Sequence, residues 1–258
     1  MFDFKSFSHC LRLVPSFLRL ARHAPDARSP FFHDWGRLAD QTVLREEFLP
    51  ALCKGKRVLH FGFVDAPFSE ERIKKGLLLH QQIQKAAEFL YGLDIDAASL
   101  EVYRKLTSDH QNSILDITAP LPEAGFLAQR YDLILFPEVL EHLLRPADAM
   151  ANLRRICQLN PGARLCVTTP NAYSVMGFFT ALSGNELVHP DHYFYFSPAT
   201  LTKLLRDTGF TDIELSLYTS QALRGSPGIT KHGLIALCSP GGDGAAPAQA
   251  TSLRSNAS

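Results

Sequence analysis

The sequence predicts an α/β fold in which a seven-stranded, mostly parallel sheet is flanked by helices and carries an antiparallel edge strand. From Lys56 onward, short runs rich in β-forming residues alternate with longer stretches of helical periodicity. This alternation is typical of a parallel sheet with helices on both faces. The chain has 258 residues, of which 46% are hydrophobic and 20% are charged, and this suits one large core.

The predicted elements follow one another in a simple order. Residues 34–52 are expected to form a helix that leads into the first strand. A later helix, over 198–208, begins after Ser197 and Pro198, which suit an N-cap and the first helical position, and stops at Gly209. The remaining helices fall between the strands. The strands are expected at 56–62, 88–94, 111–115, 131–137, 163–169, 211–218 and 231–238.

The two ends of the chain differ from the central domain, which we place at residues 34–238. Within residues 1–33, apolar residues of the first 22 positions recur at steps of three and four, with basic residues elsewhere on the helix and an interruption at Pro15. Such a segment suits a peripheral membrane anchor, a lid over a substrate site, or a helix that docks on its own domain. Residues 239–258 carry little apolar surface and are expected to form a disordered tail.

The charge balance and the cysteine content argue against several classes of function. Lysine plus arginine equals aspartate plus glutamate at 26 each, so no net field attracts phosphate backbones and nucleic acid is not favoured as a partner. The five cysteines are scattered and form no C-x-x-C pair, which argues against a disulfide framework or a thiolate zinc site. With no membrane-spanning stretch and no clean signal peptide, we expect a cytoplasmic protein whose residues 1–22 can contact a membrane peripherally.

The residues that close the predicted strands are the candidates for ligand binding, because ligands of open α/β sheets bind outside the carboxyl ends of the strands. Gly62, after the first strand, permits a sharp turn and a close backbone approach to a ligand. Asp94 closes the second strand, where its carboxylate can accept hydrogen bonds from two ribose hydroxyls. Asp116, after the third strand, can accept from an exocyclic adenine amine.

The end of the fourth strand carries the candidate catalytic groups. Glu138, Glu141 and His142 stand at positions i, i+3 and i+4, so a helical turn that begins at the strand end would place them on one face. His142 could then act as a general base oriented by either glutamate. Alternatively, all three bind a divalent metal together with a downstream histidine, or Glu138 caps the following helix while His142 packs locally.

Residues 131–143, YDLILFPEVLEHL, resemble the motif after the fourth strand of class I S-adenosylmethionine-dependent methyltransferases, particularly the group of quinone-biosynthesis O-methyltransferases. The resemblance covers roughly residues 35–238, and its specificity comes from an ordered set of motifs. It implies a Rossmann-like fold. The companion motifs are NPGA at 160–163, TTPN at 168–171 and the block from His192 to Phe210.

This resemblance implies a position for the methyl donor, S-adenosylmethionine, across the first three strands. Gly62 would form the turn beside the homocysteine moiety, Asp94 would bind the ribose and Asp116 the adenine. Pro137, at the end of the fourth strand, joins this set of cofactor-binding candidates.

The first glycine-rich motif differs from the usual D-x-G-x-G-x-G of the family. Without an acid at position 60, Asp65 is the candidate partner for the methionine amino group of the donor, and the Val64 side chain would approach the cofactor. An alternative is therefore a non-catalytic Rossmann-like binding or scaffold module with a degenerate cofactor loop. His60 itself, inside a strand, is expected to be structural. The matching positions are His60, Gly62, Val64 and Ala66.

The expected reaction is S-adenosylmethionine-dependent methyl transfer, O-directed, to a small-molecule, lipid-like or sugar acceptor. Methyltransferases that act on the 3′ end of small RNAs bind a metal through a similar E-x-x-E-H and a later histidine. That resemblance implies a divalent metal, of a kind that the ligand types do not decide. Its ligands would be Glu138, Glu141 and His142, with His189 or His192 in the fourth position.

Overall fold

The computed structural model describes the central part of the chain, which includes most of the predicted domain. The predicted amphipathic segment, and the predicted tail beyond residue 242, lie outside the described residues. The residues that the structure describes are 38, 41–66, 68–123, 125–219 and 231–242.

Strands and helices alternate along this part of the chain, as the sequence predicts. The strands are β1 (Thr42–Leu44), β2 (Arg57–Phe61), β3 (Phe89–Asp94), β4 (Asn112–Ile114), β5 (Leu133–Pro137), β6 (Arg164–Pro170), β7 (Phe210–Thr219) and β8 (Gly233–Pro240). The α-helices are α2 (Arg45–Cys53), α3 (Ser69–Lys75), α4 (Leu79–Gln84), α5 (Ala97–Thr107), α6 (Pro146–Leu159), α7 (Val175–Leu182) and α8 (Pro198–Asp207). The short 3-10 helices whose full extent the structure describes are η2 (Gly125–Ala128) and η3 (Leu140–His142).

These strands form one mixed sheet, and the predicted fold class is confirmed. The order is β1-β7-β8-β6-β5-β2-β3-β4, and the pairs are parallel except those that β8 makes with β6 and β7. Since β8 lies between β6 and β7, the antiparallel strand is an interior strand and not the predicted edge strand. The edge position is taken by β1, which adds an eighth strand beside β7.

The eighth strand also shortens the helix predicted over 34–52. Thr42 and Val43 are β-branched and pair in parallel with Leu217 and Tyr218 of β7, so this stretch extends the sheet. Among the described residues from 41 onward, the α-helix covers only 45–53. The later helix matches its prediction, because Ser197 accepts the Thr200 N–H in a capping box, and Gly209 follows with φ +87°.

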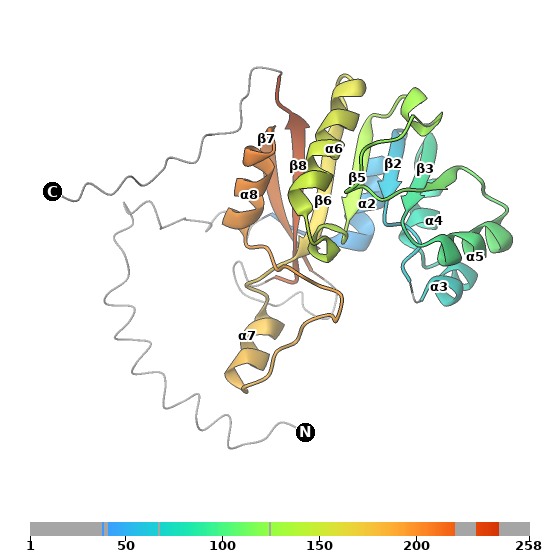
Figure 1. Cartoon of the computed structure of the whole chain (residues 1–258). Helices are drawn as coiled ribbons and strands as arrows, with labels where there is room; N and C mark the ends of the chain where they lie inside the picture. The colour runs from blue at the N-terminus through green and yellow to red at the C-terminus, as the bar shows by residue number, and fades with distance from the viewer. Residues whose placement is uncertain (1–37, 39–40, 67, 124, 220–230, 243–258) are drawn as a thin grey trace.

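Helices cover both faces of the sheet (Figure 1). On β5, Ile134 and Phe136 point to one face, where they join the core formed with α6 and α8. The alternate residues, Leu133 and Leu135, pack on the other face with Leu49 of α2. The strand therefore buries both of its sides, as parallel strands between two helical layers do.

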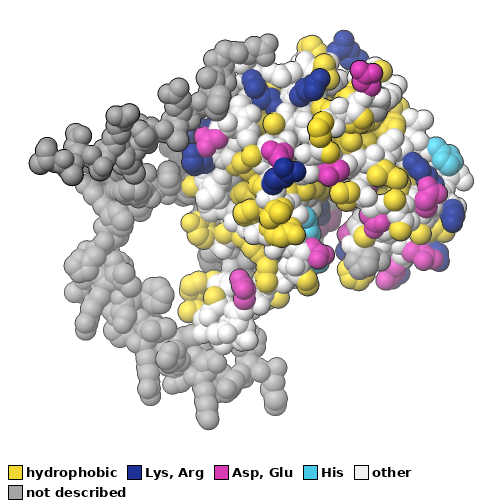
Figure 2. Space-filling view, viewed as in Figure 1, with side chains coloured by type: hydrophobic (Ala, Val, Ile, Leu, Met, Phe, Trp, Pro, Cys, Tyr) yellow, Lys and Arg dark blue, Asp and Glu magenta, His cyan; other side chains and the backbone are white. Residues whose placement is uncertain are grey.

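One helix stands apart from these layers. Residues of α7 are partly or well exposed, and none of them is buried; Figure 1 shows the helix beyond the end of the sheet. Apolar side chains lie open on the face in view, including the part that α7 forms (Figure 2). Among the described residues, no helix is both long and apolar enough to span a bilayer.

Candidate functional site

The predicted donor-site residues lie at the carboxyl ends of three neighbouring strands. Gly62 follows β2, Asp94 ends β3, and Asp116 follows β4, which is the edge strand. Backbone hydrogen bonds tie these ends together: the Gly62 N–H donates to the Leu93 carbonyl, and the Leu115 N–H donates to the Asp94 carbonyl, both at 2.8 Å. The fold therefore brings these three positions to one edge, where α/β sheets bind their ligands.

Gly62 is required by its backbone and by its neighbour. Its φ is +64°, and an added Cβ would lie 2.3 Å from Cγ2 of Val139 and 3.9 Å from the Pro137 carbonyl oxygen. A side chain cannot fit there without displacing the chain after β5. The turn after β2 is therefore packed directly against Pro137 and Val139.

Asp94 is the polar centre of this edge and is only 8% exposed. One carboxylate oxygen accepts the Val64 N–H and the other accepts the Asp96 N–H, each at 3.0 Å. Burial raises the pKa of Asp94, while these backbone donors act in the opposite direction. Because each carboxylate oxygen has a second acceptor position, Asp94 fits the two hydroxyls of a ribose.

The side chain of Val64 does not approach the donor site, contrary to the expectation from the sequence. It is 1% exposed and belongs to an apolar cluster with Phe63, Leu100 and Tyr103, between the turn and the helices α3 and α5. The residue turns its backbone N–H to Asp94 instead. A branched residue therefore fits where the family motif has a glycine.

Two other predicted carboxylates are held by local partners. Asp65, with φ +56°, pairs with the Arg72 side chain. Asp116 accepts the Thr118 N–H at 2.8 Å and the Thr118 hydroxyl at 2.6 Å, and these bonds lower the pKa of Asp116. Both side chains remain partly exposed to solvent, and a role in donor binding stays a prediction for each.

His60 occupies the position of the acid in the family motif and is buried against α4. Its Nδ1 lies 3.1 Å from Nδ1 of His80, so one ring donates and the other accepts. Burial is the first cause that lowers the pKa of both rings, that of His80 to about 3. The pair is therefore neutral at pH 7 and links β2 to α4, which agrees with the structural role expected for His60.

The chain after β5 does not form the predicted helical turn. Glu138 has φ +52° and its N–H donates to the Thr168 carbonyl of β6 at 2.9 Å. This left-handed residue redirects the backbone, so the short helix η3 contains only residues 140–142. The prediction that Glu138, Glu141 and His142 share one helical face is therefore wrong.

The side chain of Glu138 joins three elements. Its carboxylate accepts the Thr168 hydroxyl at 2.6 Å and the Tyr218 hydroxyl of β7 at 2.9 Å. Nε of Arg45, on α2, lies 3.9 Å from the same carboxylate. Burial, followed by the charge of Glu138, raises the pKa of Tyr218. The local spacing of residues in the sequence could not predict these contacts, because only the order of strands in the sheet brings Tyr218 to the end of β5.

Glu141 is fully buried behind the site. One oxygen accepts the Thr169 hydroxyl at 3.0 Å, and the other has no hydrogen-bond partner among the described residues. Burial, and next to it the charge of Glu138, raises the pKa of Glu141 well above its ordinary value. Burial at this position therefore favours the neutral form of the carboxyl.

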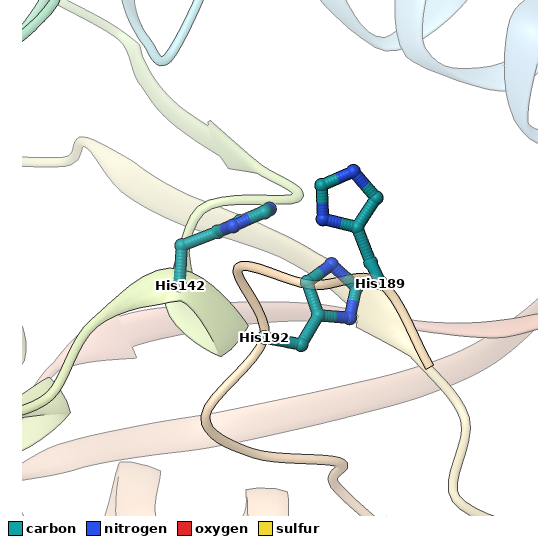
Figure 3. A group of neighbouring side chains, drawn as sticks. All are labelled: His142, His189 and His192. Carbon is teal, nitrogen blue, oxygen red and sulfur yellow. The ribbon is translucent and has the colours of Figure 1, made fainter. Parts of the chain in front are cut away.

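His142, His189 and His192 form a three-histidine cluster, whose rings converge from η3 and from the chain between β6 and α8 (Figure 3). One nitrogen from each ring lies within 4.8 Å of the others. The ring centroids are 4.5 Å apart for His142 and His192, and 5.0 Å for His189 and His192. Burial lowers the pKa of His142 and of His192.

Backbone contacts hold the two halves of the three-histidine cluster together. The N–H groups of Tyr193 and Phe194 donate to the Glu141 carbonyl, at 2.9 and 3.3 Å. The His192 N–H donates to the His189 carbonyl at 3.0 Å, which closes a turn between these two histidines. In the described part of the chain, the carboxylates of Glu138 and Glu141 do not join this group, since both point to strands β6 and β7.

Comparison with known proteins identifies the family. A family model described as a methyltransferase domain matches residues 33–215, which is more than half of the chain. No curated protein matches the sequence significantly.

Several solved structures match this chain at low sequence identity. The structure of the small RNA methyltransferase HEN1 is 16% identical, with a TM-score of 0.54, and the match covers 84% of this chain and 27% of that one. A SAM-dependent methyltransferase from Archaeoglobus fulgidus is 14% identical, with a TM-score of 0.47 and coverage of 75% and 93%. The CurJ carbon methyltransferase is 18% identical, with a TM-score of 0.49; the match covers 73% of this chain but only 49% of that one.

The family match agrees with the geometry at the ends of β2, β3 and β5. Gly62 provides the close backbone turn, and the Asp94 carboxylate provides acceptors for ribose hydroxyls. These residues fit S-adenosylmethionine, which supplies an electrophilic methyl group when bound. The chain therefore belongs to the methyltransferase domain family and is a class I S-adenosylmethionine-dependent methyltransferase.

Proposed function

We propose that this enzyme methylates a hydroxyl oxygen of an apolar, lipid-like small molecule. The observation that carries this proposal is that the three-histidine cluster and the exposed, uncharged helix α7 lie at the same edge of the sheet. His189, His192 and α7 belong to residues 171–197, which follow β6, and His142 follows β5; both strands end at the same edge of the sheet as the donor site.

The apolar character of this surface supports a lipid-like acceptor. The sequence of α7, VMGFFTAL, contains no charged residue, and Phe178 and Phe179 are each 52% exposed. Tyr193 and Tyr195, next to His192, are also exposed. An apolar surface of this kind on a folded domain commonly marks a ligand or partner site, and the aromatic rings suit an apolar body with a polar end.

The imidazoles support an oxygen nucleophile. Methyl transfer needs the nucleophile in line with the sulfonium methyl group, and a hydroxyl must also lose its proton during the reaction. Imidazole nitrogens are effective proton acceptors, and His142 lies just after β5, next to the strand that holds Gly62. The resemblance of residues 131–143 to quinone-biosynthesis O-methyltransferases supports the same choice.

Competing acceptors test the proposal. The purified chain would be incubated with S-adenosylmethionine carrying a labelled methyl group and with a long-chain alkylphenol, the matched alkylaniline, or a glucoside. We expect kcat/KM for the phenol to exceed that for the other two at least tenfold, with a methyl ether as the product. Equal or faster methylation of the amine or the sugar would contradict the proposal.

A donor-site variant provides the control. Asp94→Asn should weaken the binding of S-adenosylmethionine in calorimetry and reduce transfer to every acceptor to a similar extent. If the unaltered chain binds neither S-adenosylmethionine nor S-adenosylhomocysteine at millimolar concentration, the alternative of a non-catalytic Rossmann-like module is favoured instead.

A further inference from the structure

We infer that the three-histidine cluster is a binding site for one divalent transition-metal ion, with zinc as the preferred ion. His142, His189 and His192 supply the ligands, and the two glutamates do not. The catalytic consequence of this site rests on the proposed function, whereas binding of the ion can be measured without any methyl transfer.

The geometry needs only a small adjustment to enclose an ion. In a tetrahedral zinc site with zinc–nitrogen bonds of about 2.0–2.1 Å, the ligand nitrogens lie roughly 3.3 Å apart. The three imidazole nitrogens already lie within 4.8 Å of one another. The exposed ring of His189 can move inward, while backbone bonds to the Glu141 carbonyl fix the segment that carries His192.

Unused hydrogen-bonding capacity points to a ligand at the same place. Nδ1 of His192 is buried and has no hydrogen-bond partner among the described residues. A buried polar atom without a partner is unfavourable. Coordination of an ion by the His192 ring, with a shift of the ring nitrogen that does not bind the ion, would relieve this unfavourable state.

Asp191 is placed to support His189 as a ligand. Its carboxylate lies 3.9 Å from Nδ1 of His189, and a ligand histidine commonly donates its other N–H to a carboxylate. The Asp191 N–H now points to the same nitrogen at 3.3 Å. This long contact has to open when Nδ1 carries the proton and the other nitrogen, Nε2, binds the ion.

The ligand types favour zinc over magnesium or calcium. Imidazole nitrogen suits zinc and its neighbours in the transition series, whereas magnesium and calcium prefer oxygen ligands. Three protein ligands also leave a fourth position open, as in catalytic zinc sites. With all three imidazoles coordinated, the ion would replace a free imidazole as the group that promotes proton loss: its Lewis acidity would make a hydroxyl at the open position more acidic, and the proton would pass to solvent.

Cation binding to the full chain, purified without a histidine tag, tests the inference. After the chain is stripped with a chelator, zinc would be titrated in competition with a chromophoric chelator, and cobalt(II) would be added separately as a spectroscopic probe. We expect one zinc ion per chain and visible cobalt absorption of the intensity typical of tetrahedral coordination. His189→Ala and His192→Ala should each lower zinc affinity at least tenfold, with an unchanged circular dichroism spectrum.

Three control variants separate the ligand sets. His110→Ala, at an exposed histidine outside the cluster, should leave zinc affinity unchanged, as should Glu138→Gln and Glu141→Gln. The inference would be overturned if the unaltered chain bound zinc no more tightly than the histidine variants do. It would also be overturned if the unaltered chain bound no stoichiometric zinc. A tenfold loss in either glutamine variant would also overturn it, in favour of the mixed ligand set. Apolar hydroxyl methylation that persists without zinc binding would leave the proposed function standing and remove this inference alone.

Discussion

Two regions of the molecule are built in opposite ways. The first comprises the ends of β2, β3 and β4, and the second is the segment over residues 171–197. At the strand ends, Asp94 is buried and its carboxylate is hydrogen-bonded by the backbone, while Gly62 is packed against Val139. In residues 171–197, α7 buries none of its side chains, and the imidazoles of His189 and His192 lie close to that of His142. The first region is formed by the fold itself, whereas the second presents exposed apolar surface. Variants in the first region should therefore affect stability or donor binding, and variants in the second should affect acceptor binding or transfer.

The largest effect is expected on catalysis, at the three-histidine cluster. In His142→Asn, the loss of the imidazole should lower kcat/KM for the hydroxyl acceptor roughly 10²- to 10⁴-fold, which is the usual contribution of a proton acceptor. The ring lies outside the donor site, so calorimetric affinity for S-adenosylmethionine should stay the same. Steady-state kinetics of His142→Asn and of His110→Asn would be compared. Equal losses in the two variants, or a loss of donor affinity in His142→Asn, would remove the separation between the regions.

Gly62→Ala should have the largest effect on stability. The left-handed backbone and the contact with Val139 both oppose a Cβ, and together they should lower the free energy of unfolding by about 3 kcal/mol. Chemical denaturation would measure the change. The matched control is Gly55→Ala, where φ is +66° but nothing lies within 4 Å of the added Cβ, so about 1 kcal/mol is expected. Similar losses in both variants would show that Val139 does not constrain this turn.

The buried pair His60 and His80 should make stability depend on pH. Folding lowers the pKa of both rings below the ordinary value of 6.5, so the unfolded chain binds more protons once the pH falls below that value. Their stabilising contribution is therefore complete above pH 6.5 and is lost as the pH falls toward the folded pKa, which is about 3 for His80.

At about 1.4 kcal/mol per pH unit, His80 should lower the free energy of unfolding by about 2 kcal/mol between pH 6.5 and pH 5, and His60 should act in the same direction. Urea denaturation at these two pH values would measure it. His80→Gln should reduce the difference between the two values, whereas His110→Gln should not. A pH dependence that is the same in His80→Gln as in the unaltered chain would exclude this pair as its source.

Tyr218→Phe should have a smaller effect, because it removes only the hydroxyl that donates to Glu138. Loss of this bond beside a carboxylate should lower the free energy of unfolding by about 1–2 kcal/mol. Tyr173→Phe is the control, since Tyr173 is 51% exposed. A double-mutant cycle of Tyr218→Phe with Glu138→Gln would measure the coupling between the two side chains, and a coupling near zero would mean that Glu138 does not join β7 to the site.

The sequence predicts the features that depend on neighbouring residues. The strand alternation and the Ser197 N-cap are local patterns, and the structure has both. The position of Asp94 at a strand end is also predicted, because hydrophobic runs reveal where strands stop. The missed features involve distant partners. Helical spacing at Glu138 gave no sign of its bonds to Thr168 and Tyr218, which depend on the order of strands in the sheet.

The smallest effect on stability is expected at α7, which also gives the sharpest test of the comparison. Phe178→Ser and Phe179→Ser remove exposed rings, so each should change the free energy of unfolding by less than about 0.5 kcal/mol. Affinity for a long-chain acceptor should nevertheless fall, because these rings would contact its apolar body. The long-chain alkylphenol and unsubstituted phenol would be compared as acceptors, and only KM for the long-chain compound should rise. If both variants unfold more easily but keep KM unchanged, α7 would belong with the structural region and not with the surface that receives the acceptor.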